Sequence, residues 1–247
     1  MAAATIHETT VDVRYYELDQ EGYVKPVALL NYLQSAAAEH ALMLGVGVGD
    51  LLKRGYTWVL SRLHLRMVRY PRIRDRIVFR TWPATRETIF SVRDFELLDA
   101  AGDVIGTATT SWAVLDVKTR RPVRLDDVLP CYTLHPVRAL DDEFSTLPEL
   151  KMVDDGLRLP VLRDNLDINR HVNNTVYAGW ALEAVPGATA DTRRMVSLEI
   201  GFKAEARYGD SIVSNCRESD SEAECFLHRI VSAESGRELV RARSRWA

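Results

Sequence analysis

The 247-residue chain contains an internal repeat, and this repeat limits the folds that the chain can adopt. When Asp19 is placed on Asp167, an offset of 148 residues, the apolar positions of the two segments coincide without a gap. Further along, the offset falls to 135 and then to 134. The matched pairs are Val24 and Val172, Leu29 and Tyr177, Tyr32 and Trp180, Ala36 and Ala184, Asp75 and Asp210, and Gly102 and Gly236. A duplicated chain must be built from one supersecondary unit that can form twice.

Each repeat begins with a helical pattern and continues with strand patterns. Pro26 suits the first turn of a helix, and apolar residues lie nearly all round the segment that follows, which predicts a buried helix over Pro26–Leu44. Segments rich in β-branched and aromatic residues follow, which indicates an antiparallel sheet packed on a helix, an α+β fold. The predicted strands are Thr10–Tyr16, Tyr56–Met67, Arg76–Trp82, Thr88–Leu98 and Val104–Val117, then Val196–Phe202, Ser211–Cys216, Ala223–Val231 and Glu238–Trp246.

A change of composition separates the two repeats. From about residue 118, prolines and acidic clusters replace the apolar periodicity, which is typical of a connector on a surface. We predict an N-terminal unit over residues 1–125, a connector over 126–156 and a C-terminal unit over 157–247. The connector is long for a loop, so we expect it to contain short structure of its own.

Composition and charge argue against several functional classes. A net charge of −3 and a pI of about 6.1 give no reason to expect nucleic-acid binding. No apolar run reaches the roughly 20 residues that a membrane helix needs, and the first residues do not resemble a signal peptide. The three cysteines fit neither a disulfide framework nor a metal site. We therefore expect a cytoplasmic protein with no metal and no cofactor.

The second repeat carries reactive side chains in the stretch Leu166–Asn174. Asp167, Asn169 and His171 stand at alternate positions, so an extended chain would place them on one face. Imidazole acts as a general base near neutral pH, and a buried aspartate can also activate water. Free amide N–H groups at the start of the following helix can stabilise negative charge on a carbonyl oxygen. The stretch therefore favours hydrolysis of an acyl compound by water, and the alternative is a polar turn that only caps the helix.

The first repeat lacks most of these groups. It keeps Asp19, but Glu21 and Tyr23 replace the asparagine and the histidine. The second repeat also carries Glu205 after its clearest strand, where the first has Tyr70. One unit thus carries a candidate site, and the other is kept for shape or substrate binding. The alternative for Glu205 is an exposed carboxylate at the end of a strand.

Arginines crowd one segment of this acidic protein. Such a run is either a solvated face or a surface that attracts an acidic partner. The residues are Arg62, Arg66, Arg69, Arg72, Arg74, Arg76 and Arg80.

These motifs resemble the acyl-acyl-carrier-protein thioesterases, bacterial relatives of the plant enzymes that terminate fatty-acid synthesis. The strongest match is LDINRHVNNTVYAGWALEAVP, Leu166–Pro186, and further matches follow in order along nearly the whole chain. They include Asn31–Gln34, Trp58–Arg62, Arg69–Pro71, Thr81–Pro83, Arg93–Phe95 and Ser111–Trp112. The resemblance implies two tandem hotdog units, each a long central helix wrapped by an antiparallel β-sheet.

The resemblance also implies a reaction, the hydrolysis of a fatty acyl thioester carried on acyl carrier protein. The family's catalytic residues map onto Asp167, Asn169, His171 and Glu205. Plant members have a cysteine beside that glutamate, but Ala206 stands here, so a cysteine nucleophile has no residue at this place. Activated water is the remaining mechanism.

The acyl chain is expected to lie along the first helix, where small side chains leave space. The residues expected to bind substrate are Trp58, Ala37, Ala41, Asn173 and Asn174, with Ala36 and Ala38 beside them. Two alternatives stay open: an acyl-CoA thioesterase of the same fold, and a non-hydrolytic hotdog protein that is dehydratase-like or binds acyl groups. Two tandem units already form a pseudo-dimer, and the resemblance is compatible with a further homodimer.

Overall fold

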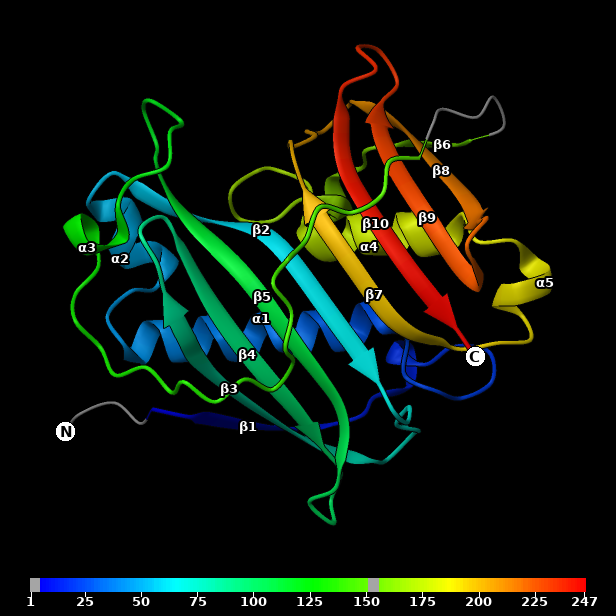
Figure 1. Cartoon of the computed structure of the whole chain (residues 1–247), viewed down its shortest axis with the longest axis horizontal. Helices are drawn as coiled ribbons and strands as arrows, with labels where there is room; N and C mark the ends of the chain where they lie inside the picture. The colour runs from blue at the N-terminus through cyan, green and yellow to red at the C-terminus, as the bar shows by residue number, and fades with distance from the viewer. Residues whose placement is uncertain (1–4, 151–155) are drawn as a thin grey trace. The chain divides into compact units, whose positions relative to one another are not determined.

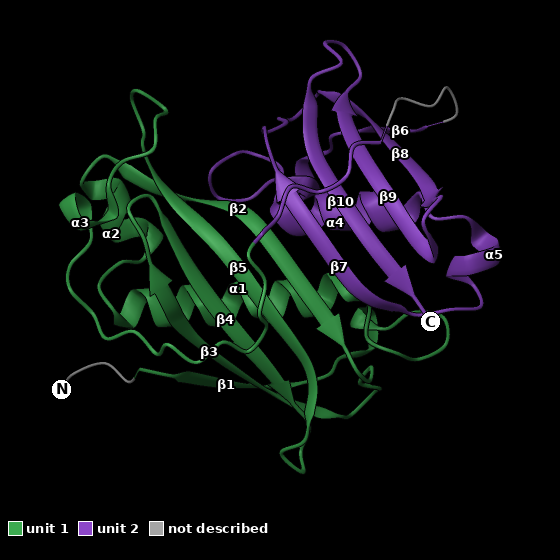
Figure 2. Cartoon of the chain, viewed as in Figure 1, with its two compact units in different colours: residues 1–143 green, residues 144–247 purple. Residues whose placement is uncertain are grey.

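A computed structural model describes residues 5–150 and 156–247 of the chain (Figure 1). It divides the chain into two compact units, unit 1 over residues 1–143 and unit 2 over residues 144–247 (Figure 2). The division falls within the predicted connector, of which residues 151–155 lie outside the described part. None of the described helices is both long enough and apolar enough to cross a membrane.

The described part of unit 1 contains an antiparallel sheet in the order β1-β3-β4-β5-β2, with α1 packed against β1 and β3. The strand predicted over Tyr56–Met67 is present with those bounds as β2, and the other predicted strands of unit 1 differ from the observed ones by a few residues. The elements are β1 (His7–Asp12), α1 (Pro26–Met43), α2 (Val48–Lys53), β2 (Tyr56–Met67), β3 (Arg76–Arg86), β4 (Phe90–Leu98), β5 (Val104–Asp116) and α3 (Leu125–Val128).

Helix α1 is buried on one face and not all round. Leu29, Leu33 and Ala36 are buried, whereas Leu42 and Met43 are 67% and 61% exposed. The expectation of a helix buried on every side was wrong, because polar side chains share one face of α1 with the two exposed apolar ones. The exposed residues are Asn31, Gln34, Ser35, Ala38, Glu39, Leu42 and Met43.

The first strand also differs from its prediction. Strand β1 ends at Asp12, and Tyr15–Glu17 forms a turn of 3₁₀-helix where the strand was expected to continue. Tyr15 and Tyr16 are 74% and 70% exposed, so the alternation that extended the prediction does not reflect burial.

The beginning of the connector is fixed to unit 1. Helix α3 is its short structure, and beyond it the chain is held by Asp94, a fully buried carboxylate on β4. Asp94 Oδ2 accepts hydrogen bonds from Arg138 Nε at 2.8 Å and from the Ala139 amide at 2.9 Å. Leu140 is buried beyond them.

The described part of unit 2 repeats this plan with a shorter helix. Its antiparallel strands follow the order β7-β10-β9-β8-β6, and α4 packs against β8, β9 and β10. The elements are β6 (Leu157–Pro160), α4 (Asn174–Glu183), α5 (Gly187–Ala190), β7 (Met195–Phe202), β8 (Ser211–Ser219), β9 (Glu222–Ser232) and β10 (Glu238–Trp246). A 3₁₀ turn at Arg163–Asn165 precedes α4, just as Tyr15–Glu17 precedes α1.

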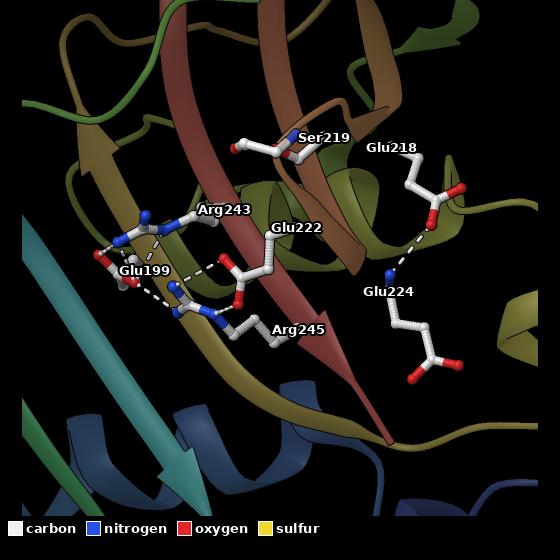
Figure 3. Close-up of polar contacts among 8 residues, drawn as sticks. Glu199, Glu218, Ser219, Glu222, Glu224, Arg243 and Arg245 are labelled. Atoms are coloured by element: carbon white, nitrogen blue, oxygen red, sulfur yellow. Dashed lines mark hydrogen bonds and ion pairs between the residues drawn. The ribbon is translucent and has the colours of Figure 1, made fainter.

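Paired charges cover the face of the unit 2 sheet that points away from α4 (Figure 3). Arg243 and Glu199 are directly opposite each other on β10 and β7, and Arg243 Nη2 lies 2.7 Å from Glu199 Oε1. Arg245 contacts Glu222 at 2.6 Å and Glu199 at 3.1 Å. Opposite charges at facing positions support this register, because a slip would move each arginine away from its glutamate.

Candidate active site

Asp167 closes a tight turn. Its amide donates to the His171 carbonyl at 2.9 Å, and its own carbonyl accepts from the Arg170 amide at 3.0 Å. Its Oδ1 accepts from the Asn169 amide at 2.8 Å and lies 3.5 Å from the His171 amide. The expectation of an extended stretch with three side chains on one face was therefore wrong. An aspartate that accepts the amide two residues on folds the chain into a turn instead.

The same turn is present in unit 1. The Asp19 amide donates to the Tyr23 carbonyl at 2.8 Å, and Asp19 Oδ1 accepts from the amides of Glu21 and Tyr23 at 2.9 and 3.0 Å. An aspartate therefore shapes the turn through the same hydrogen bonds in both units, including unit 1, whose turn has no histidine. Asp167 Oδ2 also lies 3.3 Å from Asn169 Nδ2.

One position of the turn needs a left-handed backbone. Gly22 has a φ of +79° in unit 1, and Arg170 has a φ of +63° at the same place in unit 2. This conformation costs a residue with a side chain roughly 1–2 kcal/mol. Strained backbone of this kind collects at functional loops, and Arg170 lies between Asn169 and His171.

The structure brings His171 and Glu205 together. His171 Nε2 lies 3.4 Å from Glu205 Oε2, and the side chains are 17% and 34% exposed. His171 belongs to the loop before α4, and Glu205 follows β7. The two segments are joined where the Val172 amide donates to the Ala206 carbonyl at 3.1 Å. A half-buried imidazole beside a carboxylate, still reachable from solvent, is suited to general base catalysis.

The start of α4 offers fewer free donors than expected. Asn173 is the N-cap, and its Oδ1 accepts from the Thr175 amide at 3.0 Å. The Val176 amide donates to the Asn173 carbonyl, also at 3.0 Å. The Asn174 amide has no acceptor within the described residues, so this one N–H is left to stabilise a carbonyl oxygen.

Tyr177 is a residue of the site that the sequence pattern did not reveal. It is 2% exposed, and its Oη accepts a hydrogen bond from the Ala206 amide at 2.7 Å. Burial raises the pKa of the Tyr177 hydroxyl, and the nearby Glu205 carboxylate raises it further. In the sequence, Tyr177 fits the helical spacing of apolar residues, so the pattern gave it no functional role. The available signal was its mismatch with Leu29, which has no hydroxyl.

Of the residues expected to bind substrate, Trp58, Ala37 and Ala41 belong to unit 1, and Asn173 and Asn174 belong to unit 2. Trp58 Nε1 donates to the Val46 carbonyl at 2.8 Å, and Trp58 and Ala41 pack against the same apolar cluster. Ala37 is buried, and Ala38 lies on the exposed face of α1. The cluster consists of Val46, Leu51, Val114, Leu125, Val128 and Leu129.

Several arginines of the crowded segment already have acidic partners in unit 1. Arg76 contacts Asp12 at 3.0 Å and Arg80 contacts Glu8 at 2.6 Å. Arg69 is paired with Asp99. These pairs favour the interpretation of a solvated face for this part of the segment.

Other histidines have structural surroundings. His64 Nδ1 lies 2.6 Å from Asp142 Oδ2. His228 on β9 is fully buried, with Nε2 2.8 Å from Ser244 Oγ, and burial lowers its pKa to about 4.

Known protein families match both units. The family model of the acyl-ACP thioesterase N-terminal domain matches residues 4–132, and that of the C-terminal domain matches residues 149–247. The chain belongs to the acyl-ACP thioesterase family. These matches confirm the family resemblance inferred from the sequence. The fold of this acyl-ACP thioesterase family member is the hotdog fold.

Curated relatives and solved structures agree with this assignment. The chain is 28% identical to an oleoyl-acyl carrier protein thioesterase of Arabidopsis thaliana, covering 95% of this chain and 74% of the relative. It is 27% identical to a palmitoyl-acyl carrier protein thioesterase of Cuphea hookeriana, covering 95% of this chain and 60% of the relative. An acyl-ACP thioesterase structure from Bacteroides thetaiotaomicron shares the fold, with a TM-score of 0.83, 24% identity and 98% of both chains covered.

Proposed function

We propose that this protein hydrolyses the thioester of a fatty acyl-acyl carrier protein, releasing the fatty acid and the carrier protein. Membership of the acyl-ACP thioesterase family supports the substrate class. The observation that carries the reaction type is the contact between His171 and Glu205, 3.4 Å apart in the unit that alone has both residues.

In the proposed reaction, water attacks the thioester carbonyl carbon while His171 takes one of its protons. Glu205 holds the imidazole and stabilises its protonated form. Negative charge then develops on the carbonyl oxygen, and the Asn174 amide is the proposed donor to it. When the carbon–sulfur bond breaks, His171 returns the proton to the leaving thiolate. Asn169 is proposed to position the water or the thioester.

Asp167 is the less favoured group for activating water. Its Oδ1 accepts the Asn169 amide at 2.8 Å, and the equivalent aspartate of unit 1 makes the same bond without the histidine. We therefore assign Asp167 to shaping the turn and orienting Asn169.

Unit 1 is proposed to hold the acyl chain. We propose that each unit is a hotdog unit with its longer helix at the centre, α1 in unit 1 and α4 in unit 2. The buried Ala37 of α1, and the partly buried Ala41 and Trp58 that pack against one apolar cluster, support a chain site in unit 1. A cytoplasmic location and a homodimer stay predictions.

The decisive experiment measures free fatty acid from acyl carrier proteins loaded with a ladder of chain lengths. We expect His171→Ala to lower kcat by about 10²–10⁴-fold, the usual contribution of a general base. His7→Ala is the matched control, because His7 Nε2 contacts the exposed Glu39 at 3.1 Å in unit 1. Wild-type turnover in a folded His171→Ala variant would contradict the proposal.

The same assay separates the alternatives. Equal or higher kcat/KM on matched CoA thioesters would favour an acyl-CoA thioesterase. A dehydratase-like protein would convert a 3-hydroxyacyl substrate to an enoyl product and release no free acid.

A further inference from the structure

We propose that Tyr177 is a positioning residue, which holds Glu205 against His171 through the amide of Ala206. The inference rests on the proposed function, because it concerns the same pair of side chains. It assigns a role to a buried hydroxyl that the reaction itself does not use.

The Ala206 backbone is held on both sides. Its N–H donates to Tyr177 Oη at 2.7 Å, and its carbonyl accepts from the Val172 amide at 3.1 Å. Glu205 directly precedes Ala206, and His171 directly precedes Val172. One residue therefore connects helix α4, the histidine loop and the segment that carries the glutamate. Movement of this backbone would change the 3.4 Å separation of the two reactive side chains.

Unit 1 forms the equivalent backbone contact between these two segments without a tyrosine. Its Val24 amide donates to the Pro71 carbonyl at 2.9 Å, which corresponds to the bond from Val172 to Ala206. Pro71 has no N–H, and Leu29 at the place of Tyr177 has no hydroxyl. The donor and its acceptor are thus present together in unit 2 and absent together in unit 1. Because unit 1 forms the junction without them, the tyrosine contact is not a requirement of the turn.

The hydroxyl is itself fixed by packing. The Tyr177 ring lies edge-on to Trp180 with centroids 5.3 Å apart and to Phe202 with centroids 6.4 Å apart. The raised pKa keeps the hydroxyl neutral in the pH range of an assay, so it adds no charge beside Glu205. A rigid, neutral acceptor is what a catalytic backbone segment needs, since displacements of about 1 Å can lower turnover about 100-fold.

Tyr177→Phe tests the role, because it removes the acceptor and keeps the ring. We expect kcat on acyl carrier protein substrates to fall about 10- to 100-fold, with KM unchanged. Ser214→Ala is the matched control. Ser214 is fully buried, and its Oγ donates to the Trp180 carbonyl of the same helix at 2.9 Å. The control should lose a similar amount of thermal stability and keep the wild-type kcat.

A double variant tests whether the loss of kcat comes from the unpaired Ala206 N–H. It also gives a second test if Tyr177→Phe alone does not fold. Tyr177→Phe combined with Ala206→Pro removes the donor as well as the acceptor, as unit 1 does, so no buried N–H is left without a partner. We expect it to be more stable than the single variant and to regain part of the lost kcat. A double variant no better than Tyr177→Phe alone would overturn the inference.

Two further outcomes would also overturn it. One is wild-type kcat in Tyr177→Phe, and the other is an equal loss of kcat in Tyr177→Phe and Ser214→Ala. Amide hydrogen exchange provides a readout that does not depend on turnover: in Tyr177→Phe the Ala206 amide should lose protection while the amides of α4 keep theirs. An inactive wild-type protein would refute the proposed function, whereas retained protection of Ala206 would refute the positioning role.

Discussion

His228 makes the stability of the fold depend on pH. It is fully buried, and burial lowers its pKa from 6.5 to about 4. In the unfolded chain the same imidazole binds a proton near its ordinary pKa. As pH falls below that value, the unfolded state therefore binds more protons than the folded state, and the free energy of unfolding decreases. The loss begins near pH 6.5 and levels off below about pH 4.

The size of the effect follows from the shift. Each unit of pKa difference corresponds to about 1.4 kcal/mol, so the full shift of His228 corresponds to about 3 kcal/mol. Among the described groups that titrate in acid, Glu238 is the other one with a large shift, because its hydrogen bond to Arg241 lowers its pKa from 4.5 to about 2. That contribution is lost only as pH falls below about 4.5, so the window between pH 6.5 and 4.5 isolates the histidine.

Urea denaturation followed by tryptophan fluorescence at several pH values in this window provides the measurement. His228→Gln is the reference, because glutamine can still bond to Ser244 but does not titrate. The variant should be less stable than wild type at neutral pH, with a smaller loss on acidification. Parallel curves for the two proteins would refute the reasoning, whatever their absolute stability.

Three substitutions test other parts of unit 2. Glu205→Gln keeps the size but removes the charge, so kcat should fall about 100-fold at unchanged thermal stability; wild-type kcat would exclude Glu205 from catalysis. Arg170→Gly relieves the left-handed backbone and should raise the free energy of unfolding in urea by about 1 kcal/mol, and a decrease would contradict the strain. Gly156→Ala would place a Cβ 2.5 Å from Val213 Cγ1. It should lower stability by about 1–3 kcal/mol, whereas Gly187→Ala, with its nearest atom at 3.4 Å, should stay near wild type.

The elements of the fold could largely be predicted, because their signals are local. A high content of β-branched and aromatic residues is enough to locate Tyr56–Met67 as a strand, and the absence of breakers after Pro26 locates α1. Burial around α1 could not be predicted in the same way. Leu42 and Met43 have the composition of a buried face, but their exposure depends on which side of the helix meets the sheet.

The sequence identified most residues of the candidate site, but it did not predict how they are arranged. His171 and Glu205 were both identified, but nothing local says that residues 34 positions apart lie in contact. The form of the Asp167 loop was also ambiguous, because alternate polar residues suit either a strand or a turn closed by an aspartate. Tyr177 was not identified because its hydroxyl contacts the Ala206 amide, 29 positions away, through the tertiary fold and not through a local pattern.

The aspartate turn holds its shape whether glutamate and tyrosine or asparagine and histidine occupy its variable positions, as the two units demonstrate. The conformation of the turn therefore does not depend on the asparagine and histidine side chains that it carries in unit 2. A duplicated ancestor with two working sites could lose one of them through a few substitutions while both halves kept folding. Such a loss would leave that half free to change its sequence for another role while it kept its fold.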